Sequence, residues 1–503
     1  MKPRAFPVIV GASQYTQHKG TEEPLDPLSL MEKACLESLE DAGGSGLKEL
    51  IDCVYVMNLF QWPYRDAPGM LSARLGIYPS KASYLPVGGN TPQLVMNQAA
   101  RDLALGRCRA VLMTGAEAIY SLRRAMSGDV MLDWPQSEPP ERVDGENTSG
   151  VNAIEEAYEL FFPSFMYPLF ETSLRASKGA SPGEHQAYMG RSFERLCRIA
   201  SSNPYAWSRK YMSTFDIATP TRDNRYIGYP YTKCMNANIN VDQCAALIIT
   251  TEDTARACGI SRDKWVYPTG GADLNDIWHV TRRPCLHESR AIRTASRLAL
   301  EQAGLTLDDI DMFDLYSCFP SAFEIARIEV GIGNDDRRDL SVTGGLPFFG
   351  GPGNNYSMHA ISTVVELIRK DRSLKAMVTA NGWYLTKHSV GIYSGMPSKN
   401  PWEDRDDSPL QRAIDAEALP EPVMRANGTL LVEAYVIRHD NAGNPVSGTV
   451  VGRLEEGART LAHIDAGMDE LLQMEKIELV GKVGEVRHKV SSVRNMVRFN
   501  GAW

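Results

Sequence analysis

Hydrophobic and polar positions at the start of the chain follow two periods in turn, and each period predicts one kind of element. Short apolar runs at residues 7–10, 53–57 and 110–114 are typical of buried strands. Apolar residues at helical spacing fill 29–41 and 93–106, and a glycine follows the first of these helices at the point where helices commonly end. Strands that alternate with helices predict an α/β domain.

Residues 119–232 interrupt this alternation. The segment is rich in Pro, Ser, Tyr and Met and has no regular succession of strands and helices. Long segments of this kind often cover a binding site. We therefore expect a partly helical insertion over a pocket. A buried strand at 236–251 then completes a first half, residues 1–262.

The strand–helix pattern then begins again. A short strand is expected at 266–270, a helix at 288–302 and a strand at 312–316. These elements open a second half, residues 263–396.

Two segments of the first half recur in the second half in the same order. ACLESLEDAG at 34–43 parallels ASRLALEQAG at 295–304, and the segment 99–117 parallels 364–382. A sequence repeat indicates a repeated structural unit. The chain therefore predicts two similar sheets with helices between them.

The composition changes again near residue 397. Residues 397–420 are polar and contain prolines, as linkers do. Short strands at regular spacing, with a hairpin turn at 441–444, then predict a small antiparallel β-barrel over 421–503. Its strands are expected at 428–436, 445–454, 459–463 and 477–485, and one short helix at 466–472.

Composition narrows the functional classes. The 503 residues are 43% hydrophobic and 23% charged, as in globular proteins, and the net charge of −9 argues against a nucleic-acid surface. No apolar run approaches the roughly 20 residues of a membrane helix, and the N-terminus lacks a signal-peptide pattern. The nine cysteines are scattered without zinc spacing. We expect a cytoplasmic protein with no metal, no membrane insertion and no nucleic-acid partner.

Glycine-rich turns mark the candidate site. Residues 343–355 form such a turn before an amphipathic helix, and a second turn near 382–388 carries His388. Glycine lets the backbone approach a ligand closely. We expect these two turns to rim a pocket. A further turn, Gly88-Gly89-Asn90-Thr91, opens the helix at 93–106.

The doubled halves, the insertion and the glycine turns resemble the thiolase superfamily over residues 5–395. The pattern is most similar to the sterol-carrier-protein thiolases and, among them, to the thiolase-like protein type 1 group. Asn203-Pro204-Tyr205-Ala206 with Arg209-Lys210 is similar to that branch's loop segment. The C-terminal part resembles the oligonucleotide-fold-like barrels that accompany some members. The resemblance implies a duplicated βαβα thiolase fold of five layers, followed by that barrel.

The resemblance also implies a ligand of the acyl-CoA or related thioester class. A thiolase holds the acyl group on a thiolate, uses a second cysteine as acid and base, and uses histidines for activation and for an oxyanion hole. At the four corresponding positions this chain has Gly89 (or Asn90, if the register shifts by one), Tyr316, Gly351 and Ala380. We therefore expect a thiolase-like protein without thiolase activity.

Three functions stay open. The first is an acyl-CoA-binding enzyme of this superfamily with other chemistry. The second is retro-aldol cleavage of a 3-hydroxyacyl-CoA, because thiolase-fold aldolases resemble this pattern in their tyrosines and their small barrel partner. The third is a non-catalytic acyl-CoA-binding protein. The family implies a homodimer, with a monomer as the alternative, and no cofactor beyond the coenzyme A thioester.

The candidate residues follow from the matched motifs. The candidate catalytic residues are Tyr316, Tyr356 and His388. The two tyrosines are expected to act as acid–base groups, and Lys387 or His388 is expected to shift the pKa of a phenol if the final turn folds over the pocket. The motif Tyr316-Ser317-Cys318-Phe319 makes Cys318 a neighbour of the site, more structural than nucleophilic. The expected binding residues are Asn90, Cys318, Gly351, Asn381 and Gly382.

Overall fold

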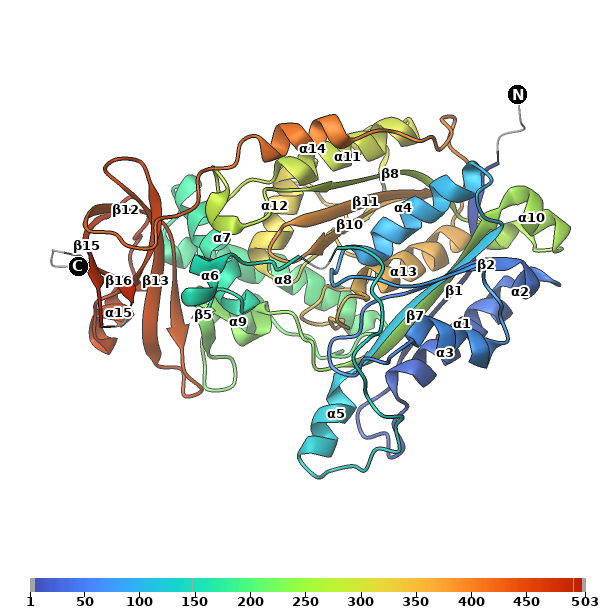
Figure 1. Ribbon diagram of the computed structural model, residues 1–503, viewed down its shortest axis with the longest axis horizontal. Coiled ribbons are helices and arrows are strands. Elements are labelled where there is room, and N and C mark those ends of the chain that lie inside the picture. Colours follow the sequence, from blue (N-terminus) through green and yellow to red (C-terminus); the bar gives the residue numbers. More distant parts are fainter. Residues whose placement is uncertain (1–4, 147, 492, 500–503) are drawn as a thin grey trace.

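Two central sheets, helices on their faces and a β-barrel at one end make up the protein (Figure 1). The computed structural model describes residues 5–146, 148–491 and 493–499. Among these residues, no helix is both long enough and apolar enough to cross a membrane.

The first sheet has five strands in the order β1-β7-β4-β2-β3. β2, β3 and β4 are parallel, whereas β7 is antiparallel to both of its neighbours, β1 and β4. The strands are β1 (Pro7–Thr16), β2 (Ile51–Val56), β3 (Lys81–Tyr84), β4 (Ala110–Ala118) and β7 (Asp242–Thr251).

The second sheet repeats the first four strands of this arrangement. Its order is β8-β11-β10-β9, with two antiparallel pairs followed by one parallel pair, as in β1-β7-β4-β2. The strands are β8 (Tyr267–Asn275), β9 (Met312–Asp314), β10 (Lys375–Gly382) and β11 (Lys387–Ser394). The repeat seen in the sequence is therefore a repeat of topology.

Helices complete five layers. α1 and α3 cover the outer face of the first sheet, α4 and α13 lie between the sheets, and α11 and α12 cover the second sheet. Strand periodicity explains the division: Val54 and Val56 pack with the outer helices, while Tyr55 packs with the central ones. The bounds are α1 (Pro27–Ala42), α2 (Leu47–Leu50), α3 (Ala67–Leu75), α4 (Thr91–Ala104), α10 (Glu252–Ala257), α11 (Arg290–Ala303), α12 (Pro320–Val330) and α13 (Tyr356–Lys370).

The two repeated helices end in the same way. α1 stops at Gly43 with φ of 66°, and α11 stops at Gly304 with φ of 69°. A left-handed residue at this position closes a helix, and glycine adopts it without steric cost. The duplicated strand–helix arrangement expected from the sequence is confirmed.

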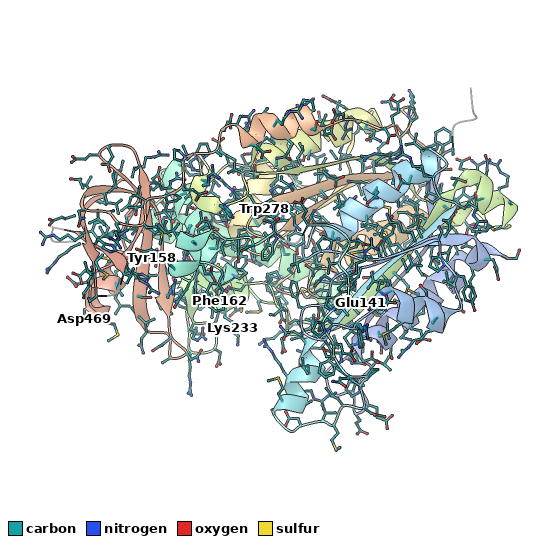
Figure 2. The ribbon with its side chains drawn as sticks, in the orientation of Figure 1. Glu141, Tyr158, Phe162, Lys233, Trp278 and Asp469 are labelled. Atoms are coloured by element: carbon teal, nitrogen blue, oxygen red, sulfur yellow. The ribbon has the colours of Figure 1, made fainter. Side chains whose placement is uncertain are left out.

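The insertion is mostly helical and joins the sheets to the barrel. Its elements are α5 (Ile119–Met126), α6 (Ala153–Ala157), α7 (Pro163–Ser177), α8 (Pro182–Ser202), α9 (Thr214–Ala218), β5 (Tyr226–Tyr229) and β6 (Tyr231–Thr232). α7 and α8 pack against α12, and β5 pairs with the barrel strand β12. Tyr158 of the insertion lies at this junction with the barrel (Figure 2). The backbone amide of Asn495 in the barrel donates to its hydroxyl at 2.8 Å.

Five strands close the C-terminal barrel in the order β12-β13-β14-β16-β15-β12. All pairs are antiparallel except β14–β16, which is parallel. A five-stranded barrel with a helix between its third and fourth strands fits the oligonucleotide-fold expectation. The elements are α14 (Ser408–Asp415) before the barrel, then β12 (Gly428–His439), β13 (Pro445–Leu454), β14 (Arg459–Ile464), α15 (Met468–Met474), β15 (Val483–Lys489) and β16 (Arg494–Arg498).

Several predicted strand boundaries were wrong, and β1, β4 and β8 run on to Thr16, Ala118 and Asn275, past their expected ends. β7 begins at Asp242, because the backbone just before it bonds to the loops at Cys318 and Leu346. β9 ends at Asp314, so Tyr316 lies beyond the strand. In the barrel, the strand expected at 477–485 begins only at Val483, and β16 was not predicted. Each boundary depends on partners that are distant in the sequence.

Candidate functional site

The turn Gly88–Thr91 and the glycine-rich segment 343–355 meet between the two halves. The amide of Gly88 donates to Asn354 Oδ1 at 2.7 Å, and the Ser357 hydroxyl at the start of α13 donates to the carbonyl of Gly89 at 3.1 Å. These bonds hold the turn that precedes α4 against the N-terminus of α13.

Tyr316 occupies the space beside Gly89. A Cβ atom built on Gly89 would lie 2.2 Å from the Tyr316 hydroxyl oxygen and 2.6 Å from the carbonyl oxygen of Asn381, closer than real Cβ contacts. The φ angle of Gly89 is not in the left-handed region. Glycine is therefore required here for space and not for backbone conformation.

Tyr316 also lines a small cavity. Tyr316, Ala380, Asn381 and His388 line it together with apolar side chains, and its volume is about 10 Å³. A cavity of this size holds at most one water molecule. Tyr316 is only 7% exposed, and burial raises the pKa of its phenol well above the ordinary value near 10. At neutral pH the phenol is therefore a hydrogen-bond donor rather than a base.

The ring of Tyr356 packs against the ring of Tyr316. The two rings meet edge to face, with centroids 5.4 Å apart and an interplanar angle of 87°. The Tyr356 hydroxyl donates to Asp314 Oδ1 at 3.0 Å and shares a 2.6 Å hydrogen bond with Thr343. Burial and the Asp314 carboxyl raise the pKa of Tyr356 well above its usual range. The structure thus brings the two predicted tyrosines together, but it directs the Tyr356 hydroxyl to Asp314.

His388 lines the cavity from β11 and is fixed by a carboxylate. Its Nε2 lies 3.1 Å from Asp276 Oδ2. Burial alone would raise the pKa of Asp276, but the hydrogen bond with His388 and the charge of Arg283 outweigh burial and hold that pKa below its usual value. His388 is therefore oriented by an ionised partner.

Cys318 and Asn381 lie side by side at the same site. Asn381 Nδ2 is 3.8 Å from the Cys318 sulfur, and burial raises the pKa of the Cys318 thiol to about 12. A thiol with this pKa is almost entirely protonated at neutral pH and is a weak nucleophile.

Tyr167 belongs to the site, although nothing in the sequence distinguished it from other tyrosines of the insertion. From α7, its hydroxyl donates to the carbonyl of Trp383 at 2.8 Å and accepts from Asn381 Nδ2 at 2.8 Å and from the amide of Leu385 at 3.3 Å. Trp383 and Leu385 have φ of 56° and 50°, which non-glycine residues rarely adopt. The Tyr167 hydroxyl therefore stabilises the strained turn of residues 382–386 through its hydrogen bonds to Trp383 and Leu385.

The remaining predicted binding residues divide into two groups. Asn90 and Gly382 lie together: a Cβ on Gly382 would be 2.5 Å from Asn90 Oδ1, while Asn90 Nδ2 donates to Ser389 at 3.3 Å. Gly351 lies apart from the cavity lining, where its amide donates to the carbonyl of Asn238 at 2.8 Å and a Cβ would make only ordinary contacts.

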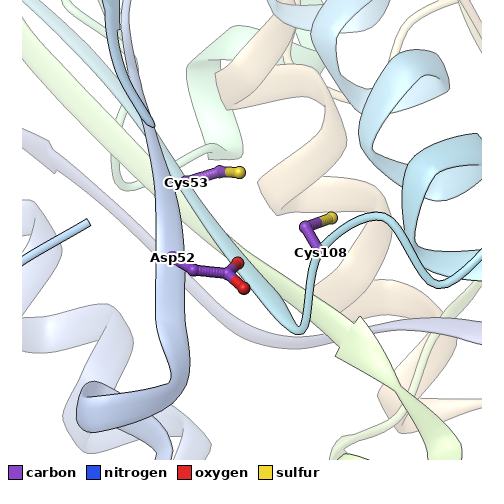
Figure 3. A group of neighbouring side chains, drawn as sticks. All are labelled: Asp52, Cys53 and Cys108. Carbon is purple, nitrogen blue, oxygen red and sulfur yellow. The ribbon is translucent and has the colours of Figure 1, made fainter. Parts of the chain in front are cut away.

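Two described clusters have the geometry to hold a metal ion. In one, Asp52 and Cys53 on β2 face Cys108 in the loop before β4, with ligand atoms within 4.8 Å of one another (Figure 3). The Asp52 carboxylate already accepts the amide of Arg109 at 3.1 Å. The other cluster is Cys285, His287 and Glu288. The first cluster brings Cys108 next to Asp52 and Cys53, which lie far from it in the sequence. The spacing of cysteines along the chain therefore does not predict this cluster.

Comparisons with known proteins agree with this architecture. Residues 409–489 match the family model described as the thiolase-like protein type 1 additional C-terminal domain. No curated protein matches the chain. Two solved structures of low identity share the fold. An acetyl-CoA acetyltransferase from Syntrophomonas wolfei is 14% identical, with a TM-score of 0.55, and the match covers 78% of this chain and 100% of that one. An Ltp2–ChsH2(DUF35) aldolase is 18% identical, with a TM-score of 0.60, and the match covers 77% and 97%.

A further match extends over the whole chain. The crystal structure of a monomeric SCP2-thiolase-like protein type 1 from Mycobacterium smegmatis has a TM-score of 0.84 and 30% sequence identity. The match covers 98% of this chain and 99% of that one, so both the thiolase-like halves and the barrel are shared. The chain belongs to the SCP2-thiolase-like protein type 1 family.

Proposed function

We propose that this protein binds an acyl-CoA or a related thioester and does not catalyse thiolysis. The observation that carries the second part of the proposal, the absence of thiolysis, is the contact between Gly89 and Tyr316. The Tyr316 hydroxyl fills the space into which a side chain at position 89 would extend. The turn that should carry the thiolase nucleophile has no room for it.

The other groups near this turn do not replace the nucleophile. Thiolysis proceeds through an acyl group held on a thiolate. Ala380 cannot donate or accept a proton, and the Cys318 thiol is held in its protonated form. Removing residues that act as a unit removes most of their joint catalytic advantage.

The thioester class follows from family membership, and Tyr316 gives it a role in this site. A protonated, buried phenol can donate a hydrogen bond to a thioester carbonyl oxygen or to an enolate oxygen. The cavity of about 10 Å³ is smaller than an acyl group, so binding requires its lining to rearrange. We propose a monomeric protein, the state described for the Mycobacterium smegmatis relative.

Two assays on the same preparation test the proposal. Acetoacetyl-CoA thiolysis, followed by loss of the enolate absorbance, should be undetectable. Calorimetry with acetyl-CoA and longer acyl-CoAs should show binding that weakens in Tyr316→Phe and is unchanged in a variant of the exposed Lys482. Thiolysis at a rate typical of thiolases, or no binding of any acyl-CoA, would contradict the proposal.

Retro-aldol cleavage of a 3-hydroxyacyl-CoA is the second candidate. It needs no acyl-enzyme: a base removes the hydroxyl proton, the C–C bond breaks, an aldehyde or ketone leaves, and the thioester enolate is protonated. The support for this reaction is the protonated phenol of Tyr316 beside the cavity, which can donate a hydrogen bond to an enolate oxygen, with its ring packed against Tyr356. Turnover of 3-hydroxyacyl-CoAs by wild type that falls about 10²-fold in Tyr316→Phe would support it. Binding without any turnover would leave a non-catalytic acyl-CoA-binding protein.

A further inference from the structure

Lys387 extends from the first residue of β11 across to the turn of the other half. Its Nζ donates to the carbonyl of Val87. A Cβ on Gly88 would lie 2.6 Å from this Nζ, and a Cβ on Gly382 would lie 3.0 Å from Cε. Gly88 from the first half and Gly382 from the second half therefore leave the space that the Lys387 side chain occupies.

The ammonium group of Lys387 has no carboxylate near it. Within the ranges that the structure describes, no Asp or Glu oxygen lies within 4 Å of its Nζ, whereas Lys178 and Lys264 pair with Glu324 and Asp41 at 2.5 and 2.8 Å. Beside it, the Asn90 Oδ1 is buried and has no hydrogen-bond partner among the described residues. A cation without a counter-ion and an unused acceptor thus lie around the same glycine, and Lys387 itself is partly exposed.

This environment favours the neutral amine. Burial without a counter-ion disfavours the charged form and lowers the pKa of Lys387 to about 8. At pH 7.5 about a quarter of such amines are neutral, against roughly 0.1% for an ordinary lysine. Desolvated lysines of this kind attack carbonyl carbons.

We propose that Lys387 is a nucleophilic amine of the site that forms an imine with an aldehyde or ketone ligand. The Nζ lone pair forms a bond to the carbonyl carbon, and the carbonyl oxygen takes up a proton. The resulting carbinolamine loses water, which carries away that oxygen, and a C=N bond remains. Asn90 Oδ1 lies in the same space beside Gly88 and makes no hydrogen bond with a described residue, so it is free to accept one from the ligand or the carbinolamine. No oxidant or reductant is needed.

This inference goes beyond thioester binding and does not depend on it. Aldehydes and ketones are also the class of compound that a retro-aldol reaction releases, so an amine at this turn would hold that product. Failure of acyl-CoA binding would leave the lysine proposal intact, and failure of imine formation would leave the thioester proposal intact.

Reductive trapping tests the proposal on the full-length protein. The protein is incubated with propanal and sodium cyanoborohydride at pH 7.5, and peptide mass mapping follows the alkylation of each lysine with time. Initial alkylation at Lys387 should be at least about 10-fold faster than at the exposed Lys210 and Lys482, whose exposure is seen in the structure. Equal or slower alkylation of Lys387 would overturn the proposal.

A variant and a pH series separate reactivity from access. Lys387→Arg keeps the charge and the hydrogen bond to Val87 but has no nucleophilic amine, so it should melt like wild type and lose the fast adduct. The alkylation rate at Lys387 should level off above about pH 8, while the rates at Lys210 and Lys482 continue to rise. A Lys387 rate that rises in parallel with the exposed lysines would also overturn the proposal.

Discussion

Replacement of Gly89 by alanine tests the contact on which the proposed function rests. The added methyl would begin 2.2 Å from the Tyr316 hydroxyl and 2.6 Å from the carbonyl oxygen of Asn381. The tyrosine is held by Tyr356 and the carbonyl belongs to the backbone of β10, so neither can retreat easily. The turn must shift, or the two halves must separate locally.

The magnitude follows from two opposing effects. Overpacking a tight interior costs typically about 1–3 kcal/mol. Because Gly89 does not need a positive φ, alanine also restricts the unfolded chain, which stabilises the protein by about 0.4–1 kcal/mol. We expect a net loss of about 1–2 kcal/mol in the free energy of unfolding.

Gly183 supplies the matched control. It lies in the first turn of α8, its φ is not left-handed, and no described atom would lie within 4 Å of an added Cβ. Gly183→Ala should therefore be neutral or stabilising by up to about 1 kcal/mol. The double variant Gly89→Ala/Tyr316→Phe should lose less stability than the sum of the single variants, because it removes the nearest clashing atom.

Urea unfolding followed by fluorescence and by circular dichroism measures these differences. The two probes are needed because a chain with sheets and a separate barrel can unfold in more than one step. The reasoning is refuted if Gly89→Ala is as stable as Gly183→Ala, or if the double variant shows no coupling. Either result would mean that Tyr316 does not fill the space beside Gly89.

Three further predictions follow from single groups. Tyr167→Phe leaves the Trp383 carbonyl and the Asn381 amide without their partner and should cost about 1–3 kcal/mol, measured by urea unfolding against wild type. Burial raises the pKa of Glu117 to about 8, so the free energy of unfolding should fall as pH rises from about 4.5 to 8, by up to about 1.4 kcal/mol per pH unit. Glu117→Gln should flatten this slope, and an unchanged slope would exclude Glu117 as its source. The contact with the Cys108 thiol lowers the pKa of Cys53, so iodoacetamide at pH 7.5 should alkylate Cys53 well before Cys318. The reverse order in a peptide map would count against the Cys53–Cys108 contact.

Local patterns were sufficient to predict the architecture. The duplicated strand–helix order, the helix ends at Gly43 and Gly304 and the regular spacing of the barrel strands depend on neighbours a few residues away. Periodicity reports which face of an element is buried, and glycine reports where a helix can end. These patterns can be read from the sequence alone, and they predicted the two halves, the insertion and the barrel.

Tertiary packing alone decided which side chains meet at the site. Tyr316 faces Gly89 and Lys387 reaches Val87 because two sheets and two central helices bring the halves together, and Tyr167 arrives from the insertion. The parallel pairing of β14 with β16 and the late start of β15 likewise depend on barrel closure. Distances between such groups are set by the packing of all the layers at once. No local pattern contains them, so the sequence named candidate residues and the fold determined what each one can contact.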